Sequence, residues 1–319
     1  MVDELVIRPY VPGDEEAILG LFHLAFGQSL DMAAWRWRYL ENPYGGPLID
    51  LMWDGDKLVG QYAVSPLDMS IDGETYPCAL SLDTITHPVY GGRGIFTRLA
   101  TSLYNRIAES GYAMVWGFPN ENSHHGFVKR LTWLDIATIP MLCLRSKPEG
   151  HPQTEIRPLD NFDAQVDALF KQERKSWQCL TVRSARYLNW RFFRRPGRRY
   201  YAAGVYSGDR LVGYSVYKLF QSAEQKLGDI VDVFCVQDGR TFADLLARTA
   251  QESFRLGAQA VNLWMNEHSP FYPAVQEMGF LPDAPHTFFA GRAFAAGLPA
   301  ERLAEWKNWY MQMGDSDVY

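Results

Sequence analysis

The sequence predicts an α/β (α+β) protein built from two tandem copies of one domain. The chain has 319 residues, which is enough for about two domains of average size. In residues 80–111, a predicted strand runs through a glycine-rich turn into a predicted helix. Several short segments of the first half recur in the second half in the same order. These three observations together favour a repeated α/β architecture.

The first copy is predicted to open with a strand and two helices. Ile7-Arg8-Pro9 begins a short strand, and the acids of 14–16 stand in the first turn of a helix with one apolar face. Asp31 is the expected N-cap of a second helix over 32–40. Strands follow at 48–53 and 58–64, joined by a turn at Asp54-Gly55-Asp56.

The central stretch of this copy is the segment from His87 to Phe96. Before it, residues 80–86 alternate apolar and polar side chains, as a strand does. After it, an apolar residue recurs every four positions from Ile95 to Ile107, and Gly111 closes the predicted helix. Glycines in such a turn leave backbone N–H groups unobstructed, and the first N–H groups of a helix lack internal partners. The segment is therefore predicted to bind an anion, best a phosphate.

Two familiar phosphate motifs are excluded here. No Gly-Lys-Ser/Thr follows the glycines, so the segment is not a nucleotide P-loop. The third glycine of a dinucleotide fingerprint would fall at position 97, which is Thr. The spacing Gly92-x-Gly94 instead resembles the acyl-CoA loop of the Gcn5-related N-acetyltransferases (GNAT), Arg/Gln-x-x-Gly-x-Gly/Ala between the fourth strand and the next helix. Position 89 departs from that pattern because it is Val.

This resemblance implies two GNAT folds, each with a mixed, mostly antiparallel sheet flanked by helices, and acetyl-CoA as cosubstrate without a metal. In that fold, the strands before and after the loop helix part, and pantetheine lies between them. The residues implied to contact the cofactor, largely through their backbone, are Ile85, Thr86, Gly91, Gly92, Arg93, Gly94, Ile95, Phe96 and Asn122.

The internal repeat sets the predicted domain boundaries. Ile156-Arg157-Pro158 matches Ile7-Arg8-Pro9, an offset of 156 − 7 = 149. Residues 208–213 match 55–60, at 208 − 55 = 153. The predicted division is an N-terminal GNAT domain at 1–146, a linker at 147–153, a degenerate GNAT-like domain at 154–292, and a C-terminal helix and tail at 293–319.

The two predicted loops differ. Where the first copy has Gly91-Gly92-Arg93-Gly94, the second has Gln237-Asp238-Gly239-Arg240 on a shorter loop. An added negative charge and fewer free amides disfavour pyrophosphate. Acyl-CoA is therefore assigned to the N-terminal copy alone.

Direct attack of an amine on a thioester requires a group that takes a proton from the ammonium and one that protonates the thiolate. The candidates are Asp83 on the cofactor strand, His124 and His125 after the following strand, and Asp317 or the terminal carboxylate. Ser123 is the candidate proton donor to the thiolate. Each has a structural alternative: a role of Asp83 shared with its repeat partner Asp232, a surface histidine pair, or a frayed tail.

Aromatic residues in and after the second predicted helix lie where the GNAT fold shapes its acceptor pocket. They are Trp35, Trp37, Tyr39 and Tyr44, and they suit a sugar ring or an apolar amine. Aromatic residues at helical spacing are more often part of the core, and that alternative stays open.

The overall composition restricts partners and location. The net charge of −6 argues against binding nucleic acid through a basic surface. The local basic run of Arg191, Arg194, Arg195, Arg198 and Arg199 is expected to be mostly solvated. The four cysteines have no metal or redox spacing, and the N-terminal Met1-Val2-Asp3-Glu4-Leu5 is acidic. With no apolar run long enough to span a bilayer, a cytoplasmic protein without membrane contact is expected.

The predicted function is transfer of an acetyl or other acyl group from CoA to a primary amine of a small molecule, with an amino sugar or sugar nucleotide as the first candidate. Two alternatives remain. One is a non-catalytic acyl-CoA sensor or scaffold. The other is a Fem-like peptidyl transferase that uses aminoacyl-tRNA, against which the acidic balance and the intact glycine loop count. A monomer or a homodimer is expected.

Overall fold

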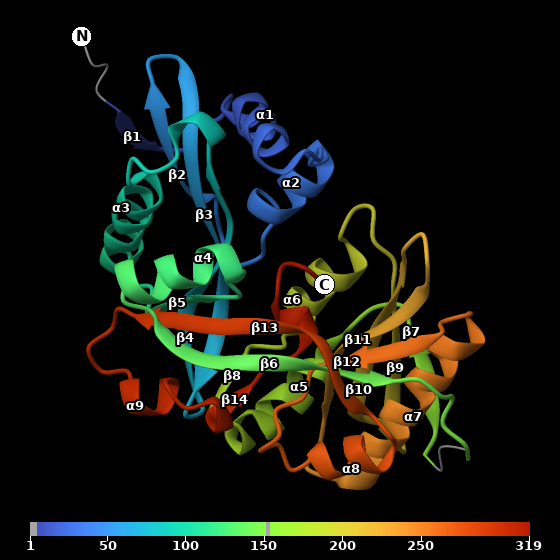
Figure 1. The fold of residues 1–319 in the computed structure, drawn as a ribbon. Helices are drawn as coiled ribbons and strands as arrows, with labels where there is room; N and C mark the ends of the chain where they lie inside the picture. The colour runs from blue at the N-terminus through green and yellow to red at the C-terminus, as the bar shows by residue number, and fades with distance from the viewer. Residues whose placement is uncertain (1–4, 151–153) are drawn as a thin grey trace. The chain divides into compact units, whose positions relative to one another are not determined.

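The structure, a computed structural model of the chain, describes residues 5–150 and 154–319. These residues form two compact units (Figure 1). The first unit comprises residues 5–68, 76–136 and 288–300, and the second comprises 69–75, 137–150, 154–287 and 301–319. Residues 151–153 of the predicted linker and Met1 to Glu4 of the acidic N-terminus lie outside the described residues.

The first unit contains one sheet with helices. Its elements are β1 (Val6–Pro9), α1 (Glu15–Phe26), α2 (Met32–Tyr39), β2 (Leu48–Asp54), most of β3 (Lys57–Ile71) and of β4 (Glu74–Thr86), α3 (Ile95–Glu109), β5 (Met114–Gly117), α4 (Glu121–His125) and the end of β13 (Leu281–Ala293). The strands lie in the order β1, β2, β3, β4, β5, β13. The pair β4 and β5 is parallel, whereas β1–β2, β2–β3 and β13–β5 are antiparallel.

The second unit repeats this plan. Its elements are most of β6 (Leu134–Leu144), β7 (Ile156–Leu159), α5 (Ala164–Glu173), β8 (Cys179–Thr181), α6 (Ala185–Leu188), β9 (Tyr200–Ser207), β10 (Arg210–Gln221), β11 (Lys226–Cys235), α7 (Gly239–Arg255), β12 (Ala260–Leu263), α8 (Tyr272–Glu277), α9 (Ala300–Leu303) and β14 (Trp309–Tyr310). The strand order is β6, β12, β11, β10, β9, β7, and β11–β12 is the parallel pair. The repeated order of strands and helices confirms the tandem architecture.

Each unit takes its last strand from the other half of the sequence. Residues 290–293 of β13 pair with β5 in the first unit, and residues 142–144 of β6 pair with β12 in the second. The compact units are therefore discontinuous, whereas the ranges predicted from the sequence, 1–146 and 154–292, are continuous. Residues 293–319, predicted as a helix and tail, contain the last residue of β13, the short helix α9, three-residue helical turns and β14.

The core of the first unit holds α3 against the sheet. The side chains of Ile95, Leu99, Leu103 and Ile107 are at most 1% exposed, so the predicted apolar face of α3 is its buried face. A Cβ on Gly60 of β3 would lie only 2.5 Å from a methyl group of Ile95. This close approach fixes the start of α3, and hence the glycine loop, against β3 (Figure 1).

Candidate donor and catalytic site

The parallel strands β4 and β5 part next to the glycine loop. Their pairing runs from Cys78 and Met114 to Ser81 and Gly117, where β5 ends while β4 continues to Thr86. Two residues beyond the last pair, Asp83 has a φ of +44°, which is rare for a residue other than glycine. The end of β4 therefore has no partner on β5, as the resemblance to the GNAT fold predicts for the pantetheine gap.

The glycine loop leaves the start of α3 open. Gly92 and Gly94 have φ values of +76° and +71°, and a Cβ on either would have no heavy atom within 4 Å. Gly94 is the N-cap of the 15-residue helix α3, and no side chain caps it. The first N–H groups of α3 are thus without a capping acceptor, which is the arrangement that binds anions.

The two arginines of the loop region have local partners. The Arg93 guanidinium lies 4.7 Å from the centroid of the Tyr90 ring. Arg98 donates a hydrogen bond of 3.2 Å to the backbone oxygen of Leu5.

The other predicted cofactor residues follow the loop and the gap. Ile85 and Ile95 are at most 2% exposed, so their side chains belong to the core. The Phe96 ring packs edge-on to Phe127, with centroids 5.0 Å apart. Asn122 is exposed on α4.

The two histidines of α4 differ in their surroundings: His124 contacts neighbouring side chains, whereas His125 is exposed. The Nε2 atom of His124 lies 2.9 Å from Oδ1 of Asp135, and the imidazole stacks on Phe288 at 4.1 Å between centroids. His125 is exposed. A carboxylate that accepts from an imidazole fixes its tautomer and orientation, as in catalytic histidine pairs. Sequence reasoning missed Asp135 because no motif spacing links it to His124.

Ser123 and Asp83 have structural partners of their own. Ser123 forms a capping box with Asn120 at the start of α4, in which its Oγ accepts from the Asn120 N–H at 3.1 Å. The Asp83 carboxylate receives hydrogen bonds of 2.7 Å from both Arg38 and Tyr39. Because the carboxylate links α2 to β4 through these two hydrogen bonds, this geometry favours the structural alternative for Asp83.

Most of the predicted acceptor aromatics are core residues. Trp35, Trp37 and Tyr39 are at most 4% exposed, and the Trp35 ring packs on Tyr39 at 5.4 Å. Tyr44 is half-buried after α2. The three aromatic residues on α2 are therefore core residues, as the alternative interpretation expected.

A buried hydroxyl network lies where β4 and β5 separate. The Tyr62 hydroxyl bonds Ser81 at 2.7 Å and the Tyr104 hydroxyl at 2.6 Å, and the Trp133 indole donates to Tyr104 at 3.0 Å. Burial raises the pKa of Tyr62 and of Tyr104. Both remain neutral hydroxyls that fix the geometry of the last strand pair. No sequence pattern indicates this network, because its four residues are far apart in the chain.

The second unit lacks the open helix start of the first. The Asp238 side chain caps α7 and accepts from the backbone N–H of Thr241 at 2.9 Å and from its hydroxyl at 2.6 Å. These hydrogen bonds lower the pKa of Asp238, so its carboxylate is ionised at neutral pH. Its negative charge stands where a phosphate would have to bind, as the comparison of the two loops predicted.

The C-terminal segment fills the corresponding gap between β11 and β12. The Tyr310 hydroxyl donates to the backbone oxygen of Val233 on β11, and a Cβ on Gly314 would lie 2.8 Å from the oxygen of Val231. From the end of β12, Asn266 donates to the backbone oxygen of Trp309 at 2.9 Å. The gap that holds pantetheine in the resembling fold is thus occupied by the chain itself in this unit.

Buried arginines hold that segment in place. Arg183 bonds the carboxylates of Asp232 and Asp315, each at 3.0 Å. Arg191 and Arg195 both donate to the backbone oxygen of Tyr319. The expectation that the basic run is solvated is therefore wrong for Arg191, which is 4% exposed. Asp317 lies in this second unit, where its backbone oxygen accepts from Arg195 at 3.5 Å.

The described residues contain no helix that is both long enough and apolar enough to cross a membrane. All four cysteines are buried and free of disulfides.

Comparison with known proteins agrees with this geometry. Residues 6–134 match the family model of the acetyltransferase (GNAT) domain. No curated protein sequence matches the chain significantly.

Solved structures are similar over nearly the whole chain. A GCN5-related N-acetyltransferase from Anabaena variabilis superposes with a TM-score of 0.73 at 13% identity, covering 92% of this chain and 73% of that one. One from Kribbella flavida gives 0.68 at 15% identity, covering 92% and 71%. Saccharomyces cerevisiae N-myristoyltransferase with bound myristoyl-CoA gives 0.63 at 11% identity, covering 91% and 83%. At these identities the likeness concerns the fold. The match over residues 6–134 shows a GNAT acetyltransferase domain in the first half of the chain, and the structural likeness shows that the fold of the whole chain is that of these acyltransferases.

Proposed function

We propose that the protein transfers an acetyl group from acetyl-CoA to a primary amine of a small molecule, with an amino sugar or sugar nucleotide as the first candidate acceptor. The observation that carries this proposal is the open loop of Gly92 and Gly94 beside the parting strands β4 and β5. A pyrophosphate would meet the free N–H groups at the start of α3, and pantetheine would follow the unpaired end of β4 at Ile85 and Thr86. The myristoyl-CoA bound in a neighbour of the same fold supports a CoA thioester as the donor class.

His124 is the proposed general base. Its pairing with Asp135 at 2.9 Å favours an imidazole oriented to accept a proton from the substrate ammonium. The amine nitrogen then attacks the thioester carbonyl, a C–N bond forms, and the C–S bond breaks. Ser123, next to His124, is the proposed donor of a proton to the leaving thiolate, and the second proton that the attacking nitrogen loses as the amide forms replaces the proton of the hydroxyl. Free, buried cysteines are consistent with a reducing cytoplasm as its location.

Calorimetric titration with acetyl-CoA tests the donor site. The native protein should bind one equivalent, and Gly92→Glu should bind none, because its carboxylate would stand where the phosphates dock. Gly27→Glu is the matched control, since Gly27 has a similar φ of +67° and equally open surroundings away from the loop. Two equivalents would show that the second unit also binds the donor. No binding by the native protein would refute the proposal.

A panel of amines then tests the acceptor. Release of free thiol with an amino sugar, and not with water alone, is the expected result. Binding of acetyl-CoA without turnover on any amine would favour a sensor or scaffold.

A further inference from the structure

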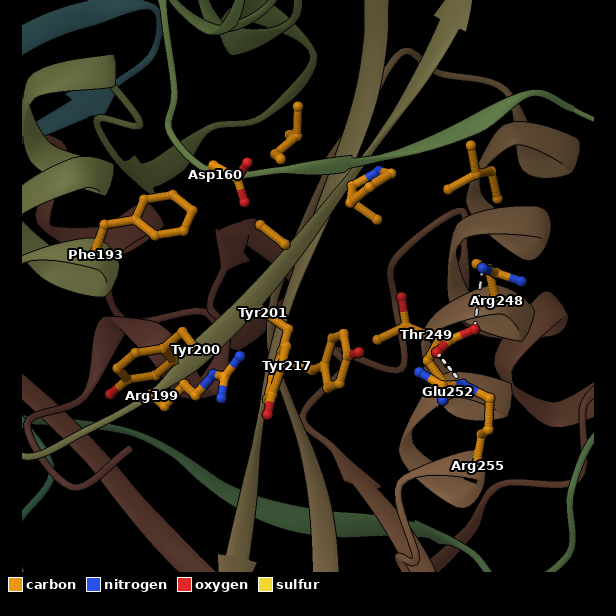
Figure 2. Close-up of a pocket in the computed structure, with 15 residues that line it drawn as sticks. Asp160, Phe193, Arg199, Tyr200, Tyr201, Tyr217, Arg248, Thr249, Glu252 and Arg255 are labelled. Atoms are coloured by element: carbon orange, nitrogen blue, oxygen red, sulfur yellow. Dashed lines mark hydrogen bonds and ion pairs between the residues drawn. The ribbon is translucent and has the colours of Figure 1, made fainter.

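A cavity of about 640 Å³ lies in the second unit (Figure 2), and none of the residues that line it belongs to β11 or β12. It opens where β7 ends beside the start of β9 and is closed on the other side by the C-terminal half of α7. The pairing of β7 with β9 stops at Leu159 and Ala202, so Tyr200 and Tyr201 lie beyond the end of β7. The volume falls within the range of roughly 300–1,000 Å³ that is typical of small-molecule sites.

One wall of the cavity is aromatic and apolar. Tyr201 and Tyr217 are cross-strand partners whose rings stack with centroids 5.1 Å apart and an interplanar angle of 19°. The Arg199 guanidinium lies 4.9 Å from the centroid of the Tyr201 ring. Further apolar lining comes from Ile156, Leu159, Phe193 and Ala203. A flat hydrocarbon body suits such a wall, because aromatic rings favour stacked and edge contacts with one another.

The helix side of the cavity is cationic. Arg248 and Arg255 both pair with Glu252, at 3.0 and 2.7 Å, as the dashed lines in Figure 2 mark. One carboxylate between two guanidinium groups leaves a net single positive charge. Arg255 retains a 64% exposed side chain, so its remaining N–H groups are open to a ligand. Asp160 lies on the far side of the cavity in Figure 2, where it disfavours a second negative charge.

Tyr217 supplies a hydrogen-bond donor that lacks an acceptor. Its side chain is directed toward α7 (Figure 2) and the residue is only 6% exposed, yet its hydroxyl forms no hydrogen bond within the described part of the chain. Burial, reinforced by the charge of Glu252, raises the pKa of Tyr217 to about 12, so the hydroxyl keeps its proton at neutral pH. The neighbouring Thr249 hydroxyl is already used, with Ser215 at 2.7 Å and the Leu245 oxygen at 2.7 Å. The Tyr217 hydroxyl is not among the fully enclosed polar atoms that lack a partner, and Tyr217 lines the cavity, so its O–H is free to donate to an acceptor atom of a bound molecule.

We infer that this cavity is a binding site for a small aromatic monocarboxylate. The carboxylate would accept from the Tyr217 hydroxyl and from Arg248 or Arg255, and the ring would lie among Ile156, Leu159 and Ala203. The single net positive charge selects a monoanion over a phosphate dianion. The inference is independent of the proposed transferase function, because every residue in it belongs to the second unit.

Calorimetric titration of the full-length protein with 2-naphthoate tests the site. One equivalent should bind, and saturating acetyl-CoA should leave this binding unchanged. Tyr217→Phe keeps the ring stack and removes only the hydroxyl, so affinity should fall several-fold, by about 2- to 10-fold for one hydrogen bond. The double variant Arg248→Gln, Arg255→Gln should lose about tenfold or more. Arg210→Gln, at an exposed arginine that begins β10 outside the cavity, should bind like the native protein.

Several outcomes would overturn the inference. They are no binding of 2-naphthoate, equal affinity for the neutral 2-naphthalenemethanol, tighter binding of the dianion 2-naphthyl phosphate, displacement by acetyl-CoA, or native affinity in both cavity variants. Circular dichroism of each variant separates lost binding from lost folding. Tyr217→Phe keeps the test decisive if the arginine double variant unfolds, because it changes one atom.

Discussion

At the scale of single residues, His124 and Asp83 differ in the partners that hold their side chains. The His124 ring nitrogen Nε2 lies 2.9 Å from Asp135 and the ring stacks on Phe288, and the proposal uses the other ring nitrogen to accept the substrate proton. The Asp83 carboxylate, by contrast, accepts hydrogen bonds from Arg38 and Tyr39. The two residues were comparable candidates by sequence, and only their partners distinguish them.

His124→Gln should therefore lower kcat by about 10²- to 10⁴-fold while acetyl-CoA binding stays native, because a general base acts on the acceptor and not on the donor. Asp135→Asn should cause a smaller loss. Steady-state kinetics with the best amine of the panel measures both. His23→Gln, on the exposed side of α1, is the control. Native kcat in His124→Gln would assign proton transfer to another group, and a matching loss in His125→Gln would point to that histidine.

At the scale of elements, the two loop helices show how one capping residue changes what a helix start can do. α3 begins at Gly94 without a side-chain cap, whereas α7 begins at Asp238, whose carboxylate accepts from Thr241. The uncapped start is available to a ligand, and the capped start stabilises the fold. This difference was readable from the sequence, since Gly and Asp at equivalent positions have opposite consequences for an anion.

Asp238→Ala should reduce the free energy of unfolding by about 0.5–2 kcal/mol at neutral pH. Because folding lowers the pKa of Asp238, its contribution is present above the unfolded pKa near ~3.9 and is lost as pH falls through the folded pKa. Urea unfolding at pH 7 and at successively lower pH should show the two proteins converging in acid. Asp209→Ala, in the exposed β9–β10 turn, is the matched control. A difference that stays constant down to the lowest pH would contradict the role of the ionised carboxylate.

At the scale of the whole molecule, local patterns predicted the elements and the repeat but not the long-range pairing. The spacing of Ile95, Leu99 and Leu103 predicts α3 from the sequence of this segment alone. β6 pairs with β12 and β13 pairs with β5, each in the unit that is built mainly from the other half of the sequence. The sequence of either strand does not predict this, because the alternation of side chains in a strand does not identify the partner strand. Burial of the α2 aromatics was likewise undecided, since helical spacing fits both a core and a pocket.

The C-terminal segment is the clearest case of a feature that only the folded chain reveals. Part of the segment predicted as a helix and tail occupies the strand gap of the second unit, where Arg183 binds Asp315 and where Arg191 and Arg195 donate to the Tyr319 oxygen. A gap filled in this way has no room for pantetheine. The second unit therefore differs from the first in two places: its loop helix is capped by Asp238, and its strand gap is filled by the C-terminal segment.

This packing predicts resistance to digestion from the C-terminal end. Carboxypeptidase should remove few residues from the native protein, and intact-mass measurement should show digestion stopping before Gly314, which packs against β11. Arg191→Gln, Arg195→Gln should release the end of the chain and let digestion proceed to that point much faster, while the stoichiometry of acetyl-CoA stays at one because the donor loop lies in the first unit. Arg194→Gln, an exposed arginine between them, should digest like the native protein. Rapid digestion of the native chain past residue 314 would refute a packed C-terminal segment, and a second equivalent of acetyl-CoA in the double variant would show that this segment alone keeps the donor out of the second unit.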